Sequence, residues 1–185
     1  EGRHRSTGGN ALRAAVLGAN DGLVSNLSLV MGVAGATLAG QGVLIAGVAG
    51  LLAGAISMAL GEWLSVQSSR ELYQHQLDTE AEEIQTSPDE EAEELALIYE
   101  ARGLEKKVAR ELAEKVLANQ ETALDTLARE ELGINPEELG GSAWEAAITS
   151  FILFALGAII PVAPFIFATG MTAVFISIGL STLGL

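Results

Sequence analysis

The sequence predicts an all-α fold: a polytopic membrane helix bundle with an acidic helical insert between the second and third membrane helices. The 185 residues are 49% hydrophobic, yet the net charge is −14. Residues 71–140 hold 20 of the 24 acidic and 6 of the 10 basic residues, so this block carries the whole net charge. The remainder is apolar and neutral, and its many glycines suit close packing of helices in lipid.

The predicted domains are a flank at 1–10, two membrane helices within 11–65, an acidic domain at 66–142 and two membrane helices within 143–185. Arg3, Arg5 and Arg13 place the flank in the cytoplasm by the positive-inside rule. Two spans return the chain to the same side, so we expect the acidic domain to be cytoplasmic as well.

The first two apolar runs cover about 11–38 and 43–64, and each exceeds the roughly 20 residues that cross a bilayer. The second helix should continue out of the membrane, because no turn signal follows until Ser87-Pro88. Those two residues predict an N-cap and first position for a new helix reaching about residue 102, with Gly103 as its stop. A helical region at 104–132 should break at Asn119.

Apolar residues at helical spacing predict that this insert has a core of its own. They are Leu95, Ile98, Leu104, Val108, Leu112, Val116, Leu124 and Leu127. A third span is expected at 143–160, a tight connection at 161–164 and a fourth span at 165–183.

Asp21 is a carboxylate within an otherwise apolar or small run, which costs roughly 2.5–3.5 kcal/mol at the centre of a membrane helix. Ser25 and Ser28 share its helix face, and Asn20 and Asn26 add polar groups nearby. Such an acid indicates a transport pathway, a relay or a binding site. The alternatives are that the span is a soluble core helix, or that Asp21 is an ordinary acid in the lipid headgroup layer. About 15 Å of helix precedes Asp21, which argues against a position in the headgroup layer.

Gly50, Gly54 and Met58 are spaced by four and share a face of the second span. The glycines allow another helix to approach closely, so Met58 points into that contact. A single methionine at such a place is most often core filler.

Residues 78–94 contain nine acids and no base, including the pairs Glu80/Glu83 and Glu91/Glu94. Like charges three residues apart repel unless a cation bridges them. If the helices fold back at Pro88, the four carboxylates can converge on one metal cluster, and such hard oxygen ligands suit Mg²⁺, Ca²⁺, Mn²⁺ and Fe²⁺. A solvated acidic face is the alternative. Glu131 is a further candidate ligand, whereas Glu62, Glu130 and His75 have no assigned role.

The sequence lacks cysteine, which excludes disulfides, thiolate zinc sites and iron–sulfur clusters. It also lacks the Glu-x-x-His pair of ferritin-like di-iron centres. No phosphate loop, nucleophile with its base, or basic nucleic-acid face is present. We therefore expect neither an enzyme nor a nucleic-acid-binding protein.

Five motifs occur in an order that resembles the vacuolar iron transporter family. They are ANDGLVSN, GAISMALGEW, the E-x-x-E repeat, REELG and AIIPVAPF. The resemblance implies a homodimer with five membrane helices per subunit that exchanges cytosolic Fe²⁺, and often Mn²⁺, for protons along the dimer interface. It assigns Asp21 and Met58 to the pathway and the glutamates to a cytoplasmic metal-binding domain. Those glutamates are Glu80, Glu83, Glu91, Glu94 and Glu131.

Some features depart from the family pattern. Leu127 and Ala128 stand where some members have a methionine pair, and Gly50 stands where some have an acid. The fifth span is absent, so we expect a truncated chain, and bacterial relatives can carry a ferritin-like domain upstream. The expected location is the plasma membrane of a bacterium or the vacuolar membrane of a eukaryote.

The leading hypothesis is a metal/proton antiporter with Asp21, Met58 and Ser25 in its pathway, for Fe²⁺ with Mn²⁺, Co²⁺ or Zn²⁺ as substitutes. A membrane-anchored metal-binding or sensing protein without transport is the alternative. A soluble helical structural protein is disfavoured by the length of the apolar segments.

Overall fold

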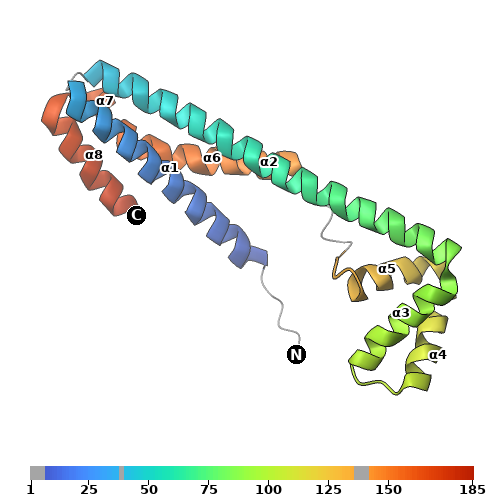
Figure 1. Cartoon of the computed structure of the whole chain (residues 1–185). Helices are drawn as coiled ribbons and strands as arrows, with labels where there is room; N and C mark the ends of the chain where they lie inside the picture. The colour runs from blue at the N-terminus through green and yellow to red at the C-terminus, as the bar shows by residue number, and fades with distance from the viewer. Residues whose placement is uncertain (1–6, 38–39, 136–141) are drawn as a thin grey trace. The chain divides into compact units, whose positions relative to one another are not determined.

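The computed structural model describes residues 7–37, 40–135 and 142–185, which form helices and no strand (Figure 1). This confirms the predicted all-α class. The chain divides into two compact units. The apolar unit comprises Glu1–Leu64 and Ala143–Leu185, and the acidic unit comprises Ser65–Ser142.

Three helices are long and apolar enough to cross a membrane: α1 (Thr7–Thr37), α2 (Gly40–Thr86) and α6 (Ala143–Val162). Helix α2 is 47 residues long, or about 70 Å at 1.5 Å per residue, more than twice a hydrocarbon core. Its apolar sequence ends near Leu64. The expected continuation of the second span as one helix is therefore confirmed.

The segment expected as a fourth span, 165–183, is not one continuous helix. Helix α7 (Pro164–Phe167) ends after four residues, and α8 covers Gly170–Gly184. Between them, Ala168 and Thr169 are extended and Gly170 has a left-handed φ of 62°.

Helices α1, α6 and α8 lie side by side in the apolar unit (Figure 1). The backbones of α1 and α6 come into direct contact at two glycines. A Cβ on Gly22 would overlap the carbonyl oxygen of Phe154, and a Cβ on Gly157 would overlap that of Ala19. Glycine at these positions therefore permits the approach that the small-residue content predicted.

The acidic unit contains the end of α2 and the helices α3 (Pro88–Ala101), α4 (Lys106–Leu117) and α5 (Gln120–Glu130). Ser87 occupies the N-cap of α3, and Gly103 follows its end with φ 100°. A break at 118–119 separates α4 from α5. The predicted helix boundaries are thus confirmed. The sequence Asn135-Pro136 also predicts a short final turn before Gly140-Gly141, and that stretch lies outside the described residues.

The core of the acidic unit is built from small residues as well as leucines. It comprises Leu95, Ala96, Ala109, Ala113 and Leu127. Val108 and Leu112, which we expected in the core, are 51% and 39% exposed. Helix α4 instead presents the alanines one position further along, whose small side chains let α3 and α4 pack closely.

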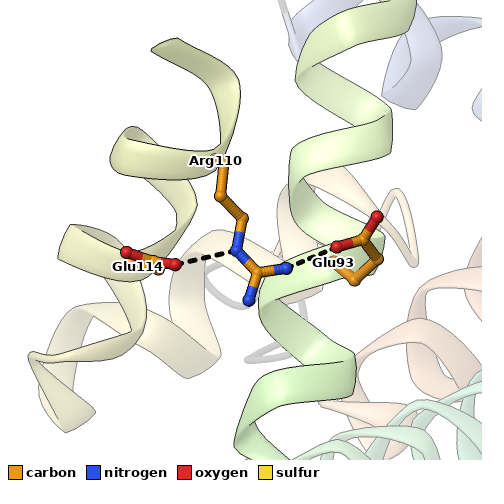
Figure 2. A network of polar contacts seen from close by, with 3 residues as sticks. All are labelled: Glu93, Arg110 and Glu114. Carbon is orange, nitrogen blue, oxygen red and sulfur yellow. Dashed lines mark hydrogen bonds and ion pairs between the residues drawn. The ribbon is translucent and has the colours of Figure 1, made fainter. Parts of the chain in front are cut away.

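An ion-pair network also joins α3 to α4 (Figure 2). The Arg110 guanidinium contacts Glu93 of α3 at 2.5 Å and Glu114 of α4 at 2.8 Å. The hydrogen bond from Arg110 to Glu114, together with the charges of Glu114 and Glu93, raises the pKa of Arg110. The pairs are at the surface, so we assign them to domain packing and not to a metal site.

Candidate functional site

The apolar unit contains a cavity of about 370 Å³ between α1, α2 and α6. It is lined by Asp21, Ser25, Asn26, Leu29, Gly50, Gly54, Ser57, Met58 and Phe154. The structure therefore places three residues that the sequence assigned to a pathway, Asp21, Ser25 and Met58, on one cavity. The first two come from α1 and the third from α2.

Asp21 is exposed on α1, one residue before the glycine that contacts α6. The hydroxyl of Ser25 donates to the Asp21 backbone carbonyl at 2.6 Å, so its oxygen keeps acceptor capacity toward the cavity. Ser28 was expected on the same face. It donates instead to the Val24 carbonyl at 2.8 Å and does not line the cavity.

Met58 packs against a small core of Ala55, Phe154 and Ala158. Its Cε lies 3.6 Å from the position that a Cβ on Gly18 would occupy. The methyl end of the thioether thus reaches α1, while the side chain remains part of the cavity wall. Met58 therefore fills space between the helices, and it also forms part of the wall of a cavity that Asp21 lines.

Asn26 has an environment that the sequence did not predict. It is 2% exposed, and its Nδ2 donates to the Gly47 carbonyl at 3.1 Å and the Ala158 carbonyl at 2.7 Å. Its Oδ1 is buried without a hydrogen-bond partner among the described residues. Leaving such an acceptor unpaired costs about 1–3 kcal/mol. The only sequence signal was a polar residue within an apolar run.

The acidic unit brings together glutamates from three segments. Carboxylate oxygens of Glu80 on α2, Glu91 on α3 and Glu131 just after α5 all lie within 4.8 Å of one another. Glu80 and Glu91 are 3% and 5% exposed, whereas Glu131 is exposed. We call these three the glutamate cluster. The turn at Ser87 is what allows α3 to return beside the end of α2.

Burial and mutual repulsion dominate the electrostatics of this cluster. Burial, followed by the charge of Glu131, raises the pKa of Glu80 to about 8. Burial also raises the pKa of Glu91, and burial with the charges of Glu94 and Glu91 raises the pKa of Glu131 to about 6. Within the part of the chain that the structure describes, Glu80 Oε1 is buried and has no hydrogen-bond partner. A bound cation would neutralise the cluster and pair that oxygen.

Other sequence candidates lie at different places. The charges of Glu83 and Glu94 raise the pKa of cluster members, but their oxygens are not among the three that converge. Glu130 forms an ion pair with Arg102. Glu62 and His75 are exposed and belong to neither the cavity lining nor the cluster.

Comparison with known proteins assigns the chain to a family. The model of the VIT family matches residues 12–185. A vacuolar iron transporter of Acanthamoeba castellanii is 42% identical over 161 residues, covering 86% of this chain and 58% of that protein. Vacuolar iron transporter 1 of Oryza sativa subsp. japonica is 33% identical over 180 residues, covering 97% of this chain and 71% of the relative.

A third relative, vacuolar iron transporter 1 of Arabidopsis thaliana, is 35% identical over 159 residues and is covered to 63% of its length. These relatives are named as transporters and not as enzymes, in agreement with the sequence prediction. The family match covers both the cavity residues and the glutamate cluster. The chain belongs to the VIT family.

Proposed function

We propose that this protein is a divalent transition-metal transporter that moves Fe²⁺ out of the cytosol in exchange for protons. The observation that carries the proposal is the presence of Asp21 and Met58 on one cavity within the apolar unit. The names of the relatives support iron as the cargo. A structural helix has no need of an acid in this position, and the cost of placing one there favours a function.

The ligand chemistry of the cavity favours a transition metal. A carboxylate binds any divalent cation, but a thioether sulfur is a poor ligand for Mg²⁺ or Ca²⁺ and a better one for softer ions. Ser25 and Ser57 provide neutral oxygens beside them. We therefore infer that Fe²⁺ is the cargo and that Mn²⁺, Co²⁺ and Zn²⁺ can substitute.

The glutamate cluster would capture the cation before transport. Three converging carboxylates in a unit that carries nearly all the net charge of the chain would raise the local concentration of divalent ions. Glu83 and Glu94 would add charge around this site. Because Glu131 is exposed, an arriving ion would meet that carboxylate first.

Proton exchange would follow from competition at Asp21. A protonated carboxyl is a far weaker metal ligand than a carboxylate, so proton binding from the far side would release the ion. After release, loss of the proton to the cytosol would restore the ligand. One group then couples the two fluxes without any additional titrating residue in the cavity.

The exposed position of Asp21 favours a homodimer in the membrane. An acid on the lipid-facing surface of a span is costly, so a second subunit would cover it and complete the pathway. The neighbouring apolar residues of α1 and α2, such as Val24 and Ile56, are also exposed in the single chain. The acidic unit and the N-terminal flank would face the cytoplasm, in either a plasma or a vacuolar membrane.

A membrane-anchored metal-binding or sensing protein is the second candidate, favoured by the glutamate cluster alone. Flux through proteoliposomes separates the two. We expect anaerobic Fe²⁺ uptake, followed by an enclosed chelating dye, to collapse for Asp21→Ala and persist for Ser28→Ala, which lies on the same helix outside the cavity. Metal binding without flux in the unaltered protein would instead establish the anchored binding protein.

A further inference from the structure

Asn26 is held in the cavity wall by two hydrogen bonds that it donates to two different helices. Its Nδ2 group donates to Gly47 of α2 and to Ala158 of α6, although the residue itself belongs to α1. Both amide hydrogens are therefore used. Reversing the amide would place its oxygen against two carbonyl oxygens, so the hydrogen bonds fix which way Oδ1 points.

The Oδ1 atom is the opposite end of this fixed group. It is buried, and no residue in the described ranges 7–37, 40–135 and 142–185 donates a hydrogen bond to it. It faces Gly50, since a Cβ added there would lie 2.7 Å from it. Gly50 and Asn26 both line the cavity that Asp21 and Met58 also line, so the unpaired acceptor lies within the wall of this cavity.

We propose that Asn26 Oδ1 is a neutral oxygen ligand for the cation carried through this cavity, in addition to Asp21 and Met58. This inference rests on the proposed transport function. An amide oxygen binds divalent cations without adding charge. It would complement one carboxylate and one thioether while leaving Asp21 as the group at which protons and metal compete.

Leu29 and this oxygen border the same small space beside Gly50. A Cβ on Gly50 would overlap the Cδ2 atom of Leu29 and lie 2.7 Å from Asn26 Oδ1. Leu29 lines the cavity and is 40% exposed. Because Oδ1 is buried, a cation that binds it would have to displace a neighbouring side chain, and Leu29 is a partly exposed one that lines the cavity.

Two substitutions separate a ligand from a purely structural residue. Asn26→Leu removes the oxygen and both N–H donors, while Asn26→Asp removes the donors but keeps an oxygen at the same distance from the backbone. A structural role predicts that Asp is at least as harmful as Leu, because it places oxygen against two carbonyls. A ligand role predicts that metal binding survives in Asp and is lost in Leu.

Binding should be measured in the full chain in detergent with Glu80, Glu83, Glu91, Glu94 and Glu131 changed to glutamine. Free Mn²⁺ is followed by electron paramagnetic resonance, and Asp21→Ala in the same background gives the binding outside the cavity. We expect Asn26→Leu to weaken cavity binding about 10- to 100-fold. The Asn26→Asp variant should bind Mn²⁺ at least as tightly as the background protein with Asn26 intact. The control Asn20→Leu, which lies outside the cavity, should bind Mn²⁺ as the background protein does.

Gly50→Ala provides a second variant that keeps the Asn26 side chain and places a methyl group against its oxygen, where the added Cβ would lie 2.7 Å from Oδ1. It should weaken Mn²⁺ binding even if Asn26→Leu fails to fold. Unchanged binding in Asn26→Leu or Gly50→Ala, or equal losses in Asn26→Leu and Asn26→Asp, would overturn the ligand assignment. Cavity binding without Fe²⁺ flux would refute the proposed transport and leave this assignment intact.

Discussion

Glu80 and Glu91 bring carboxylate oxygens within 4.8 Å of each other, although both side chains are almost fully buried. Burial raises the pKa of both groups, and that of Glu80 rises to about 8. At pH 7 the metal-free cluster therefore favours a proton on Glu80, at the place where a bound ion would supply positive charge.

Metal binding at the cluster should release that proton. With the pKa of Glu80 at about 8 and that of Glu131 at about 6, Glu80 is protonated and Glu131 is largely ionised at pH 7. We expect about one proton released per Mn²⁺ bound at pH 7, and fewer at pH 9. Calorimetric titration in two buffers of different ionisation enthalpy measures this number. Glu80→Gln is the matched variant, and proton release that survives it would contradict the assignment.

The stability of the metal-free acidic unit should fall as the pH rises. The pKa of Glu80 is raised from its ordinary value of 4.5 to about 8 in the folded protein, so the folded state keeps this proton after the unfolded state has lost it. Its contribution to stability is therefore present below pH 4.5 and is lost as the pH rises through 8. Amide hydrogen exchange of α3 and α5 in the full chain measures the change. Addition of Mn²⁺ should restore the stability that is lost at high pH. If the protection factors of the metal-free protein rise with pH, the predicted direction of the pH dependence is wrong.

Replacing the thioether should change selectivity more than stability. Met58→Leu nearly conserves volume, so it should cost less than about 1.5 kcal/mol of folding free energy. Loss of the sulfur ligand should lower Fe²⁺ flux roughly tenfold while leaving weak competition by Mg²⁺ unchanged. Proteoliposome assays of Fe²⁺ flux with and without Mg²⁺ as a competitor measure both effects. If Fe²⁺ flux is retained in full, Met58 is only a packing residue.

The contact between α1 and α6 should not tolerate a methyl group. Gly157→Ala places a Cβ against the Ala19 carbonyl, so the helices must separate at a cost of roughly 1–3 kcal/mol. Gly35→Ala on α1 is the control, because nothing lies within 4 Å of its added Cβ. The two variants are compared by heating the detergent-solubilised proteins and measuring the fraction that remains monodisperse in size-exclusion chromatography. Equal midpoint temperatures for Gly157→Ala and Gly35→Ala would show that the contact is looser than the structure indicates.

Local signals predicted most of the helix boundaries. Ser87-Pro88, Gly103 and Asn119 each interrupt a helix for reasons that depend only on adjacent residues. The helix break at residues 168–170 was not predicted, because hydropathy does not reveal the left-handed conformation of Gly170. Val108 and Leu112 were assigned to the core because spacing defines a helix face, but the neighbouring element decides which face is buried.

The candidate sites were partly predictable for a similar reason. Asp21 is conspicuous because charge is costly in an apolar run, and the E-x-x-E pairs indicated an acidic centre. Which carboxylates converge depends on how α3 and α5 pack, so sequence did not distinguish Glu91 from Glu94. The state of Asn26 depends on carbonyls 21 and 132 residues away, which no local pattern contains.

The uneven burial of the glutamate cluster has a kinetic consequence. Two of its carboxylates are enclosed and the third, Glu131, is open to solvent. If the cluster binds an ion as proposed, its one open side would let water or another ligand replace a coordinating oxygen stepwise, without unfolding of the domain. Both binding and release would then be faster than at a fully enclosed site, as a cluster that collects ions and passes them on requires.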